Sequence, residues 1–511
     1  MTSKKPDLVL TKKDEVYAKI LCEPNIAQEL SEYFTFYVPG YRFTPAFKAG
    51  HWDGKIRLLS LKTRQIYLGL LYYIEEFCTE RGYNLQYDST HPELEDEFSM
   101  YHTKKFFDLL DIHADGKKLL SRDYQLDAFQ HAMQRRRTLL VSPTASGKSL
   151  IIYMLFRQLL DYQNLKGLII VPTTQLVEQL YTDFVDYSTN NKFDVEANVH
   201  RVYEGKSKES AKKLIISTWQ SQYQLPESVF KQYDYVIGDE AHLFKAQSLT
   251  TIMTSCTNTK YRIGLTGTLD GTKTHKLVLE GLFGTHRKVI TTKELIDRKQ
   301  LSNFTIKCLM LKHPDEAAKI VKSKKIFQDE IDYLIRCESR NRFVRNLAIS
   351  LTNNTLVLYQ FVEKHGSVLY DLIRNTHNLG DRQVFFIHGG VETENREHVR
   401  HIMNEKNNVI VVASFGTFST GINIPNLHNL ILASPAKSRI RNLQSIGRSL
   451  RLFSGKDVAT LYDIADDLSV GNHMNFTLKH FLERVSIYNE EKFPFKIYKI
   501  GLKNDRRSDT H

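Results

Sequence analysis

The sequence contains little cysteine, and its cysteines are scattered. Among 511 residues there are five cysteines, and none of them forms a C-x-x-C pair. A disulfide framework draws on an even set of cysteines, and a structural zinc site draws on closely paired ones. We therefore expect neither a disulfide-based fold nor a zinc site. The cysteines are Cys22, Cys78, Cys256, Cys308 and Cys337.

Long hydrophobic runs are also missing. No apolar run approaches the roughly 20 residues that a membrane-spanning helix requires. The first ten residues, MTSKKPDLVL, lack the apolar segment of a signal peptide. We therefore expect a cytoplasmic protein with no membrane contact.

Acidic residues are scarce in two segments of this basic chain. The formal net charge is +12. Residues 41–64 carry six Lys or Arg against the single acid Asp53, and residues 433–456 carry six and no acid. Local positive charge of this kind favours a polyanionic partner, although charge alone does not identify it.

Short apolar runs alternate with longer helical patterns in two series. Continuous β-branched runs are typical of strands buried on both faces of a parallel sheet, and the helices between them suit right-handed crossovers. The fold class is therefore α/β, with two doubly wound parallel-sheet domains in tandem. The first series lies at 138–142, 165–172, 213–218, 233–240 and 261–268, and the second at 355–361, 383–389, 408–415, 429–435 and 458–466.

The chain is too long for one hydrophobic core. Four segments are predicted: a small α+β N-terminal module over 1–115, the first α/β domain over 116–298, the second over 299–475, and a C-terminal helix and tail over 476–511. In the N-terminal module, Asp53-Gly54 predicts a hairpin turn, and residues 67–83 predict a helix that ends at Gly82.

The stretch SPTASGKS, residues 142–149, has the form of a phosphate-binding loop. It follows a predicted strand and opens a predicted helix, whose first N–H groups can hold phosphate oxygens. Lys148 adds a positive charge, and Ser149 can reach Mg²⁺. Ser142 stands where the common pattern has its first glycine. The alternative is an ordinary turn with a solvated lysine.

Two further motifs could complete a nucleotide site. In VIGDEAH, residues 236–242, Asp239 is placed to hold Mg²⁺ and Glu240 to deprotonate an attacking water; the alternative is an exposed acidic turn. In QSIGRSLR, residues 444–451, Arg448 and Arg451 share one helical face. Arginines brought to a triphosphate stabilise the charge that develops during hydrolysis. The alternative there is a basic surface helix.

In order along residues 120–470, these motifs resemble those of superfamily-2 helicases of the DEAH-box type. The resemblance implies two RecA-like domains, ATP and Mg²⁺ as cofactors, and nucleic-acid-stimulated ATP hydrolysis. In this family the position of Ser142 need not be glycine, so the loop is intact, although Ala145 stands where many members carry glycine. Asn423 and Ser445 depart from the family pattern.

The resemblance also assigns roles residue by residue. It implies that Gln125, in RDYQLDAFQ, reads adenine. The implied catalytic residues are Lys148, Asp239, Glu240, Gln444, Arg448 and Arg451. The implied nucleotide contacts are Gln125, Ser142, Pro143, Thr144, Ala145, Ser146, Gly147, Lys148, Ser149 and Gly421, and Ser149 and Asp239 are the implied Mg²⁺ ligands.

Further family motifs imply nucleic-acid contacts and coupling. Hydroxyl and backbone N–H groups at the carboxyl ends of parallel strands can hold phosphates without reading bases. The coupling residues are His242, Thr266 and Thr268. The implied DNA contacts in the two domains are Pro172, Thr173, Thr218, Gln220, Gln360, Phe361, His388, Gly389, Ser414 and Thr417.

The N-terminal segment GYRFTPAFKAGHWDGKIRLL, residues 40–59, resembles that of phage recombination helicases. This resemblance implies action on forked DNA, four-way junctions and RNA–DNA hybrids, recombination or single-strand-binding proteins as partners, and the host cytoplasm as location. Tyr41, Phe43 and Phe47 interleave with the predicted DNA contacts Arg42, Lys48, Trp52, Lys55 and Arg57. The aromatics either stack on bases or form a core with solvated cations outside. Trp52, beside the predicted turn, is expected to be the most exposed.

The leading hypothesis is an ATP-dependent DNA helicase acting on branched DNA in recombination, repair and replication. Three alternatives stay open: a duplex DNA translocase that does not separate strands, an RNA-directed helicase, and a nucleotide-gated DNA-binding scaffold. A small-molecule kinase would explain the phosphate loop but not a second domain that carries arginines.

Overall fold

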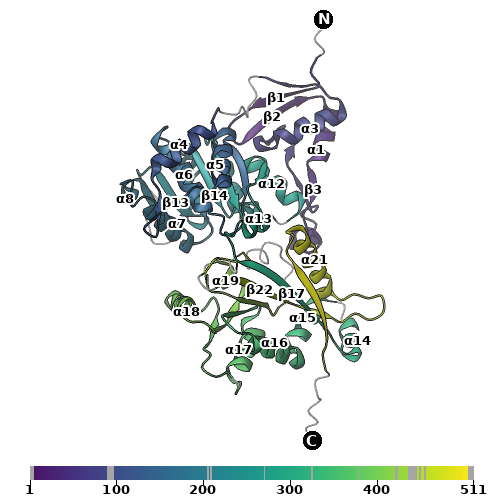
Figure 1. Cartoon of the computed structure of the whole chain (residues 1–511). Coiled ribbons are helices and arrows are strands. Elements are labelled where there is room, and N and C mark those ends of the chain that lie inside the picture. Colours follow the sequence, from purple (N-terminus) through teal and green to yellow (C-terminus); the bar gives the residue numbers. More distant parts are fainter. Residues whose placement is uncertain are drawn as a thin grey trace. The chain divides into compact units, whose positions relative to one another are not determined.

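A computed structural model describes residues 5–88, 97–203, 207, 210–269, 271–323, 326–377, 379–420, 424–434, 446–447, 450–453 and 456–503 (Figure 1). Residue contacts divide the chain into two compact units. The first contains Met1–Ser142 and Ser146–Ile290, and the second contains Pro143–Ala145 and Thr291–His511. Within the ranges given above, no helix combines the length and the apolar character that a bilayer crossing needs.

The first unit begins with a five-stranded sheet in the order β5-β6-β2-β1-β7. All neighbours are antiparallel except β1 and β7. Side chains alternate across it: Leu8 and Leu10 are buried, whereas Val9 between them is partly exposed. The strands are β1 (Leu8–Lys12), β2 (Tyr17–Cys22), β5 (Leu59–Ser60), β6 (Gln65–Tyr67) and β7 (Leu85–Tyr87), and the helices beside them are α1 (Pro24–Tyr33) and α3 (Leu71–Arg81).

Helix α3 ends where the sequence predicts. Gly82 closes it in the left-handed conformation, with φ of 71°, and its N–H donates to the carbonyls of the last turn. Glycine adopts this conformation without steric cost, which explains the stop. The helix begins later than predicted, at Leu71, because residues 68–70 form the separate 3₁₀ turn η2 (Leu68–Leu70).

The predicted hairpin at Asp53-Gly54 is wrong. Strand β4 (Lys55–Arg57) pairs antiparallel with β3 (Thr35–Tyr37), and η1 (Tyr41–Phe43) and α2 (Pro45–Lys48) lie between them in sequence. Thr44 caps α2 by accepting the Phe47 N–H, and Pro45 opens it, so a helix occupies the place of the expected first strand. Gly54 still turns the chain, with φ of 81°.

The first α/β sheet has seven strands, all parallel, in the order β12-β13-β11-β14-β15-β10-β16. The five predicted runs are confirmed as β10 (Arg137–Val141), β11 (Gly167–Val171), β13 (Leu214–Thr218), β14 (Tyr235–Asp239) and β15 (Tyr261–Thr266). The edge strands β12 (Val199–Val202) and β16 (His286–Lys288) were not predicted, because they are short and carry charged or polar residues.

Helices and one small antiparallel pair complete the first unit. The pair is β8 (His113–Ala114) with β9 (Lys117–Lys118). The helices are α4 (Met100–Leu110), α5 (Asp123–Arg135), α6 (Lys148–Asp161), α7 (Thr174–Tyr187), α8 (Val195–Asn198), α9 (Trp219–Gln222), α10 (Glu227–Phe230), the 3₁₀ turn η3 (Ala241–Lys245), α11 (Gln247–Ser255) and α12 (Lys273–Phe283).

The N-terminal sheet and the first α/β sheet share one hydrophobic core. Residues as distant in sequence as Leu70 and Phe283 belong to the same buried cluster. Backbones approach closely there: a Cβ added to Gly69 would lie 2.2 Å from the Glu280 carbonyl oxygen. Glu15 and Arg137 form an ion pair across the same contact. Contacts do not separate the two parts, so the boundary at residue 115 stays a prediction.

The second unit contains another seven-stranded parallel sheet, in the order β19-β20-β18-β21-β22-β17-β23. The five predicted runs are confirmed as β18 (Thr355–Tyr359), β19 (Val384–Ile387), β20 (Ile410–Ser414), β21 (Asn429–Leu432) and β22 (Val458–Asp467). The helices are α13 (Thr292–Asp297), α14 (Asp315–Ser323), α15 (Phe327–Arg336), α16 (Glu338–Ser350), the π-helical turn η4 (Val362–Gly366), α17 (Ser367–Arg374), α18 (Thr393–Glu405), α19 (Phe415–Thr420) and α21 (Phe476–Glu490).

The segment after residue 475 contributes to this second sheet. It contains the predicted helix, α21, and also β23 (Phe495–Gly501), which pairs with β17 (Asn303–Lys312). Helix α21 is held to β22 by a buried ion pair, in which Arg484 Nε and Nη2 lie 2.9 and 2.8 Å from the Asp463 carboxylate. Tyr488 donates a third hydrogen bond to that carboxylate, over 2.9 Å.

Candidate functional site

The phosphate loop joins β10 to α6. Gly147 has φ of 84° and precedes the first helical residue, Lys148, whose Nζ lies 3.3 Å from the Ser142 carbonyl oxygen. Ser142 Oγ donates to Ser146 Oγ over 2.7 Å, which fixes the width of the loop. The loop therefore presents the N–H groups of a helix start together with one lysine, an arrangement that suits phosphate oxygens.

Ala145 lies in this loop with φ of 67°. A non-glycine residue in the left-handed region costs ~1–2 kcal/mol, because its Cβ crowds the following carbonyl. Ala145 therefore adopts a conformation that glycine would adopt without cost, and the loop stores strain there, as functional sites often do.

Helix α5 packs its first turn against the loop. Gln125 Nε2 donates to the Ser146 carbonyl over 2.9 Å, and the Tyr124 hydroxyl donates to the same carbonyl over 3.1 Å. A Cβ added to Gly147 would lie 2.2 Å from the Gln125 amide nitrogen and would displace it, and the φ of 84° independently favours glycine there. Gln125 therefore contacts the phosphate loop itself, and its role in reading adenine stays a prediction.

Asp239 ends β14 at the same edge of the sheet as the loop. Its Oδ1 is buried and, within the described residues, has no hydrogen-bond partner. Burial is the main cause that raises the pKa of Asp239 to about 6, the neighbouring Glu240 adds to the rise, and Lys148 opposes it. Glu240 follows with φ of 50°, again in the left-handed region.

These residues fit a magnesium ion. Mg²⁺ binds oxygen ligands, and the buried Asp239 Oδ1 is an acceptor that none of the described residues satisfies. Ser149 Oγ bonds to the Tyr187 hydroxyl over 3.0 Å. Tyr187 was not identified from sequence, because it lies 38 residues away and no local pattern marks it.

A chain of contacts runs from Glu240 to the segment after β15. His242 Nδ1 lies 3.3 Å from the Glu240 carboxylate and 3.0 Å from Thr266 Oγ1. Thr266 Oγ1 donates to the Thr268 carbonyl over 3.0 Å, so Thr266 accepts from His242 and Nδ1 carries the proton. The three predicted coupling residues thus form a chain of contacts that begins at Glu240.

Polar side chains gather at the carboxyl ends of neighbouring strands in the first sheet. After β11, Pro172 precedes Thr173, which caps α7 by accepting the Leu176 N–H. At the end of the adjacent β13, Thr218 Oγ1 bonds to Ser221 Oγ over 3.0 Å. Gln220, two residues later, is exposed. The structure therefore brings all four predicted DNA contacts of this domain to one edge.

The second sheet repeats this arrangement on β19, β20 and β18, which are neighbours. Ser414 ends β20, and its Oγ bonds to Thr417 Oγ1 over 2.8 Å. Gln360 follows β18 and is exposed, and its N–H donates to Ser434 Oγ. The other predicted contacts at this edge are Phe361 after β18, and His388 and Gly389 after β19.

Several predicted residues of the second unit lie outside the described residues: Gln444, Arg448 and Gly421, with Asn423 and Ser445. Arg451 is described, and its carbonyl accepts from Lys456 Nζ over 2.8 Å and from Ser302 Oγ over 3.2 Å. Lys456 also donates to the Pro425 carbonyl over 2.9 Å, and burial lowers the pKa of Lys456 to about 7. In the sequence, this buried lysine looks like any solvated one.

Among the N-terminal aromatic residues, some are packed and one is exposed. The prediction that Trp52 is the most exposed is wrong: its indole Nε1 donates to the Lys55 carbonyl over 2.9 Å and the ring is half-buried. Phe43 is exposed instead, by 81%. Arg42, Lys48 and Arg57 are exposed, and Arg57 also pairs with Asp53.

Three protein-family models match the chain. The model described as DNA helicase UvsW, N-terminal, matches residues 7–88. The model of the type III restriction enzyme res subunit matches residues 118–271, and the helicase conserved C-terminal domain matches residues 339–453. Together the three models cover the N-terminal sheet and most of both α/β sheets.

Known proteins are similar over most of the length. The ATP-dependent DNA helicase uvsW of Enterobacteria phage T4 is 34% identical over 96% of this chain and 98% of its own. The crystal structure of T4 UvsW matches 97% of this chain and 100% of its own, with 32% identity and a TM-score of 0.52. The DNA 3′–5′ translocase XPB2 of Sulfurisphaera tokodaii is 22% identical over 65% of this chain and 79% of its own. The chain therefore belongs to the UvsW family of superfamily-2 helicases.

Proposed function

We propose that the protein is an ATP-dependent, Mg²⁺-requiring DNA helicase that acts on branched DNA. The observation that carries this proposal is the buried Asp239 Oδ1, which no described residue satisfies and which lies at the end of a strand at the same sheet edge as the Lys148 loop. The proposed parts are a DNA-binding module over 1–115, two motor domains over 116–298 and 299–475, and a C-terminal segment over 476–511.

The proposed chemistry begins with phosphate binding. Lys148 and the N–H groups at the start of α6 hold the β- and γ-phosphates. Asp239 and Ser149 would hold Mg²⁺, which would supply charge neutralisation when bound. Glu240 orients and deprotonates the attacking water. Its contact with His242, over 3.3 Å, passes a change at the carboxylate to the Thr266–Thr268 segment. Gln444, Arg448 and Arg451 are proposed to stabilise the charge on the transferred phosphoryl group.

The proposed substrate is a junction, a fork or an RNA–DNA hybrid. The hydroxyl-rich strand ends of both sheets contact phosphates and not base edges, so they can follow a strand of any sequence. The N-terminal module adds exposed cations beside an exposed aromatic ring. Recombination and single-strand-binding proteins are the proposed protein partners.

The experiment is an ATPase assay on single-stranded, duplex, forked, four-way-junction and R-loop substrates, scored also for strand separation. Hydrolysis should rise most with the branched substrates. Lys148→Ala should abolish hydrolysis and keep DNA binding, and Lys293→Ala, on the surface of α13, is the matched control. If no nucleic acid stimulates hydrolysis, the proposed function is wrong.

A duplex DNA translocase is the second candidate. It is favoured by the match of residues 118–271 to a restriction-enzyme subunit and by the relative that is named a translocase. Displacement of a triplex strand without separation of a duplex would select it.

A further inference from the structure

Residues 35–57, here called the N-terminal arm, carry Phe43 at their surface. The Phe43 ring is 81% exposed, the largest exposed fraction among the described aromatic side chains. Its neighbours in the arm, Arg42 and Lys48, are exposed as well. A single exposed apolar residue needs no explanation by itself. The packed aromatic side chains beneath Phe43, however, need an explanation.

A stack of aromatic rings fixes the backbone that carries Phe43. The Tyr37 and Tyr41 rings stack with their centroids 4.8 Å apart, and Phe47 meets Tyr41 edge to face, also at 4.8 Å. A Cβ on Gly54 would lie 2.2 Å from the Tyr41 ring, so β4 closes tightly over the stack. Phe43 lies between Tyr41 and Phe47 in sequence. The packed rings of Tyr41 and Phe47 therefore hold the backbone of Phe43 in place, while the Phe43 ring itself is exposed to solvent.

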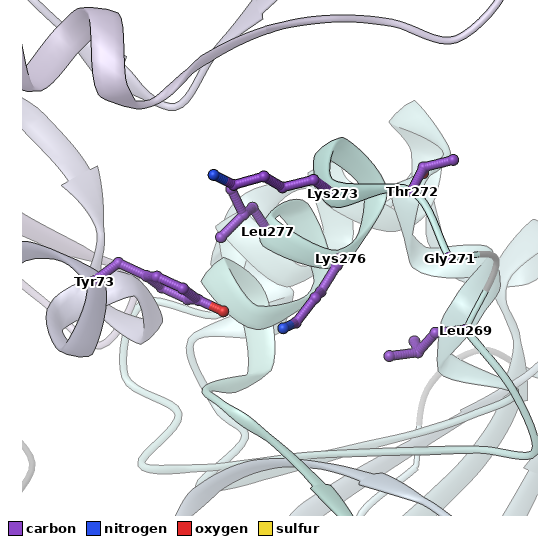
Figure 2. Close-up of a pocket in the computed structure, with 7 residues that line it drawn as sticks. All are labelled: Tyr73, Leu269, Gly271, Thr272, Lys273, Lys276 and Leu277. Carbon is purple, nitrogen blue, oxygen red and sulfur yellow. The ribbon is translucent and has the colours of Figure 1, made fainter. Parts of the chain in front are cut away.

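The arm is fixed to the helix that follows the coupling segment. Thr274 Oγ1 donates to the Tyr37 carbonyl over 3.3 Å, and Lys273 Nζ lies 5.3 Å from the centre of the Phe36 ring. Both residues belong to the first turn of α12, shortly after Thr268. Figure 2 shows Lys273 and the preceding Thr272 at this end of α12, opposite Tyr73. A cavity of about 350 Å³ lies among these residues.

The charge of the arm favours a polyanion. The arm carries four Lys or Arg and the single acid Asp53, which Arg57 already neutralises. Exposed cations beside an aromatic face match a nucleic acid, since phosphates take the cations and a base takes the ring. The interior of a linear duplex offers no free base face, because every base pair is stacked on both sides. A branch point exposes the face of its terminal base pair.

We propose that Phe43 stacks on the terminal base pair at a DNA branch point, with Arg42 and Lys48 on the flanking phosphates. This assignment rests on the proposed function and adds to it the element that recognises the branch. Because the arm is tied to α12, it moves with the motor domain as a rigid wedge. Rigidity removes the entropy that a flexible loop would lose on stacking.

The test compares Phe43→Ala and Phe43→Trp with the wild-type chain. Tyr101→Ala is the matched control, because Tyr101 is 70% exposed on α4, outside the arm. The DNA probes are a four-way junction with 2-aminopurine at the branch point and a linear duplex of the same sequence, both with their duplex ends closed by hairpin loops so that the linear probe has no free terminal base pair. Loss of one stacked base should weaken junction binding about 5- to 150-fold, which corresponds to ~1–3 kcal/mol.

Phe43→Ala should lose this affinity and the 2-aminopurine quenching, and Phe43→Trp should keep both. Affinity for the linear duplex, hydrolysis stimulated by single-stranded DNA, and the melting temperature should stay within about twofold or a degree of wild type, because the ring is exposed. If Phe43→Ala binds the junction as wild type does, or loses junction and linear DNA equally, the inference is wrong.

Two further outcomes separate the inference from its premise. If DNA stimulates ATP hydrolysis by the wild-type protein but Phe43→Ala still quenches 2-aminopurine normally, the role of Phe43 is wrong and the helicase function stands. If no DNA stimulates hydrolysis by the wild-type protein, the helicase function itself is wrong. A Phe43 variant that instead loses binding to a protein would assign the arm to a protein partner and overturn the DNA assignment.

Discussion

Replacing Asp239 with asparagine should stabilise the protein while abolishing its ATPase activity. Burial is the main cause that raises the pKa of the wild-type Asp239 carboxyl from the ordinary 3.8 to about 6. A shift of two units corresponds to about 3 kcal/mol, which is the cost of keeping this group ionised in the folded protein at pH 8. Asparagine has nearly the same shape and no charge. The free energy of unfolding of Asp239→Asn at pH 8 should therefore be about 2–3 kcal/mol higher than that of wild type.

The pH dependence has a definite sign. Between pH 3.8 and 6 the folded protein holds the Asp239 proton more tightly than the unfolded chain, so the contribution of Asp239 to wild-type stability falls as pH rises through this window. Lowering the pH from 8 to 5 should therefore remove about 1–2 kcal/mol of the cost that Asp239 alone imposes on wild type. Asp239→Asn has no such group, and its advantage should shrink by about half at pH 5.

The assay is urea unfolding without nucleotide or Mg²⁺, at pH 5, 6.5 and 8. Both tryptophans, Trp52 and Trp219, lie in the first unit, so intrinsic fluorescence follows the unit that contains Asp239. Asp108→Asn, an exposed acid on α4, is the control and should change little. A variant no more stable than wild type at pH 8, or an advantage that does not shrink at pH 5, would refute the reasoning.

Three other variants test separate contacts. Glu240→Gln should bind ATP with wild-type affinity but hydrolyse it about 10²–10⁴-fold more slowly, in a comparison of nucleotide binding with turnover, because a general base is lost; normal turnover would remove Glu240 from the chemistry. Tyr187→Phe releases Ser149 Oγ from a 3.0 Å bond and should lower the Mg²⁺ concentration for half-maximal hydrolysis up to about fivefold. A higher requirement would instead show that Tyr187 orients the serine. Arg484→Met should destabilise the second unit by about 3–5 kcal/mol in circular-dichroism unfolding, because the Asp463 charge is left buried and unpaired. Adding Asp463→Asn should recover much of that loss, and no recovery would contradict the ion-pair explanation.

Most central strands could be predicted from sequence because burial on both faces leaves a continuous apolar run. All ten predicted runs form strands of the two parallel sheets. The edge strands β12, β16 and β23 and the interior strand β17 were not among these runs, whereas β19, at the other edge of the second sheet, was. In β23, for example, Lys496 and Lys499 alternate with apolar residues on an exposed strand, so its hydropathy resembles that of a loop.

The site was predictable where one short motif supplies the geometry, and unpredictable where distant segments meet. The loop from Ser142 to Ser149 and the Asp239-Glu240 pair follow from strand, turn and helix start alone. Tyr187 reaches Ser149 only through the packing of α7 on α6, which no local spacing encodes. In the arm, the turn propensity of Asp53-Gly54 was identified correctly, but the capping of α2 by Thr44 decided the path of the chain.

The near-contact of Gly69 with α12 limits how this protein could be dissected or recombined. With 2.2 Å between a would-be Cβ and the Glu280 carbonyl oxygen, any larger residue would force the two backbones apart. Cutting the chain near residue 115 would expose the apolar face of α12 that the N-terminal module now buries. The remaining part of the chain, without that module, should therefore self-associate. Grafting the N-terminal module onto another helicase would succeed only if the recipient helix allowed the same close approach of its backbone to Gly69.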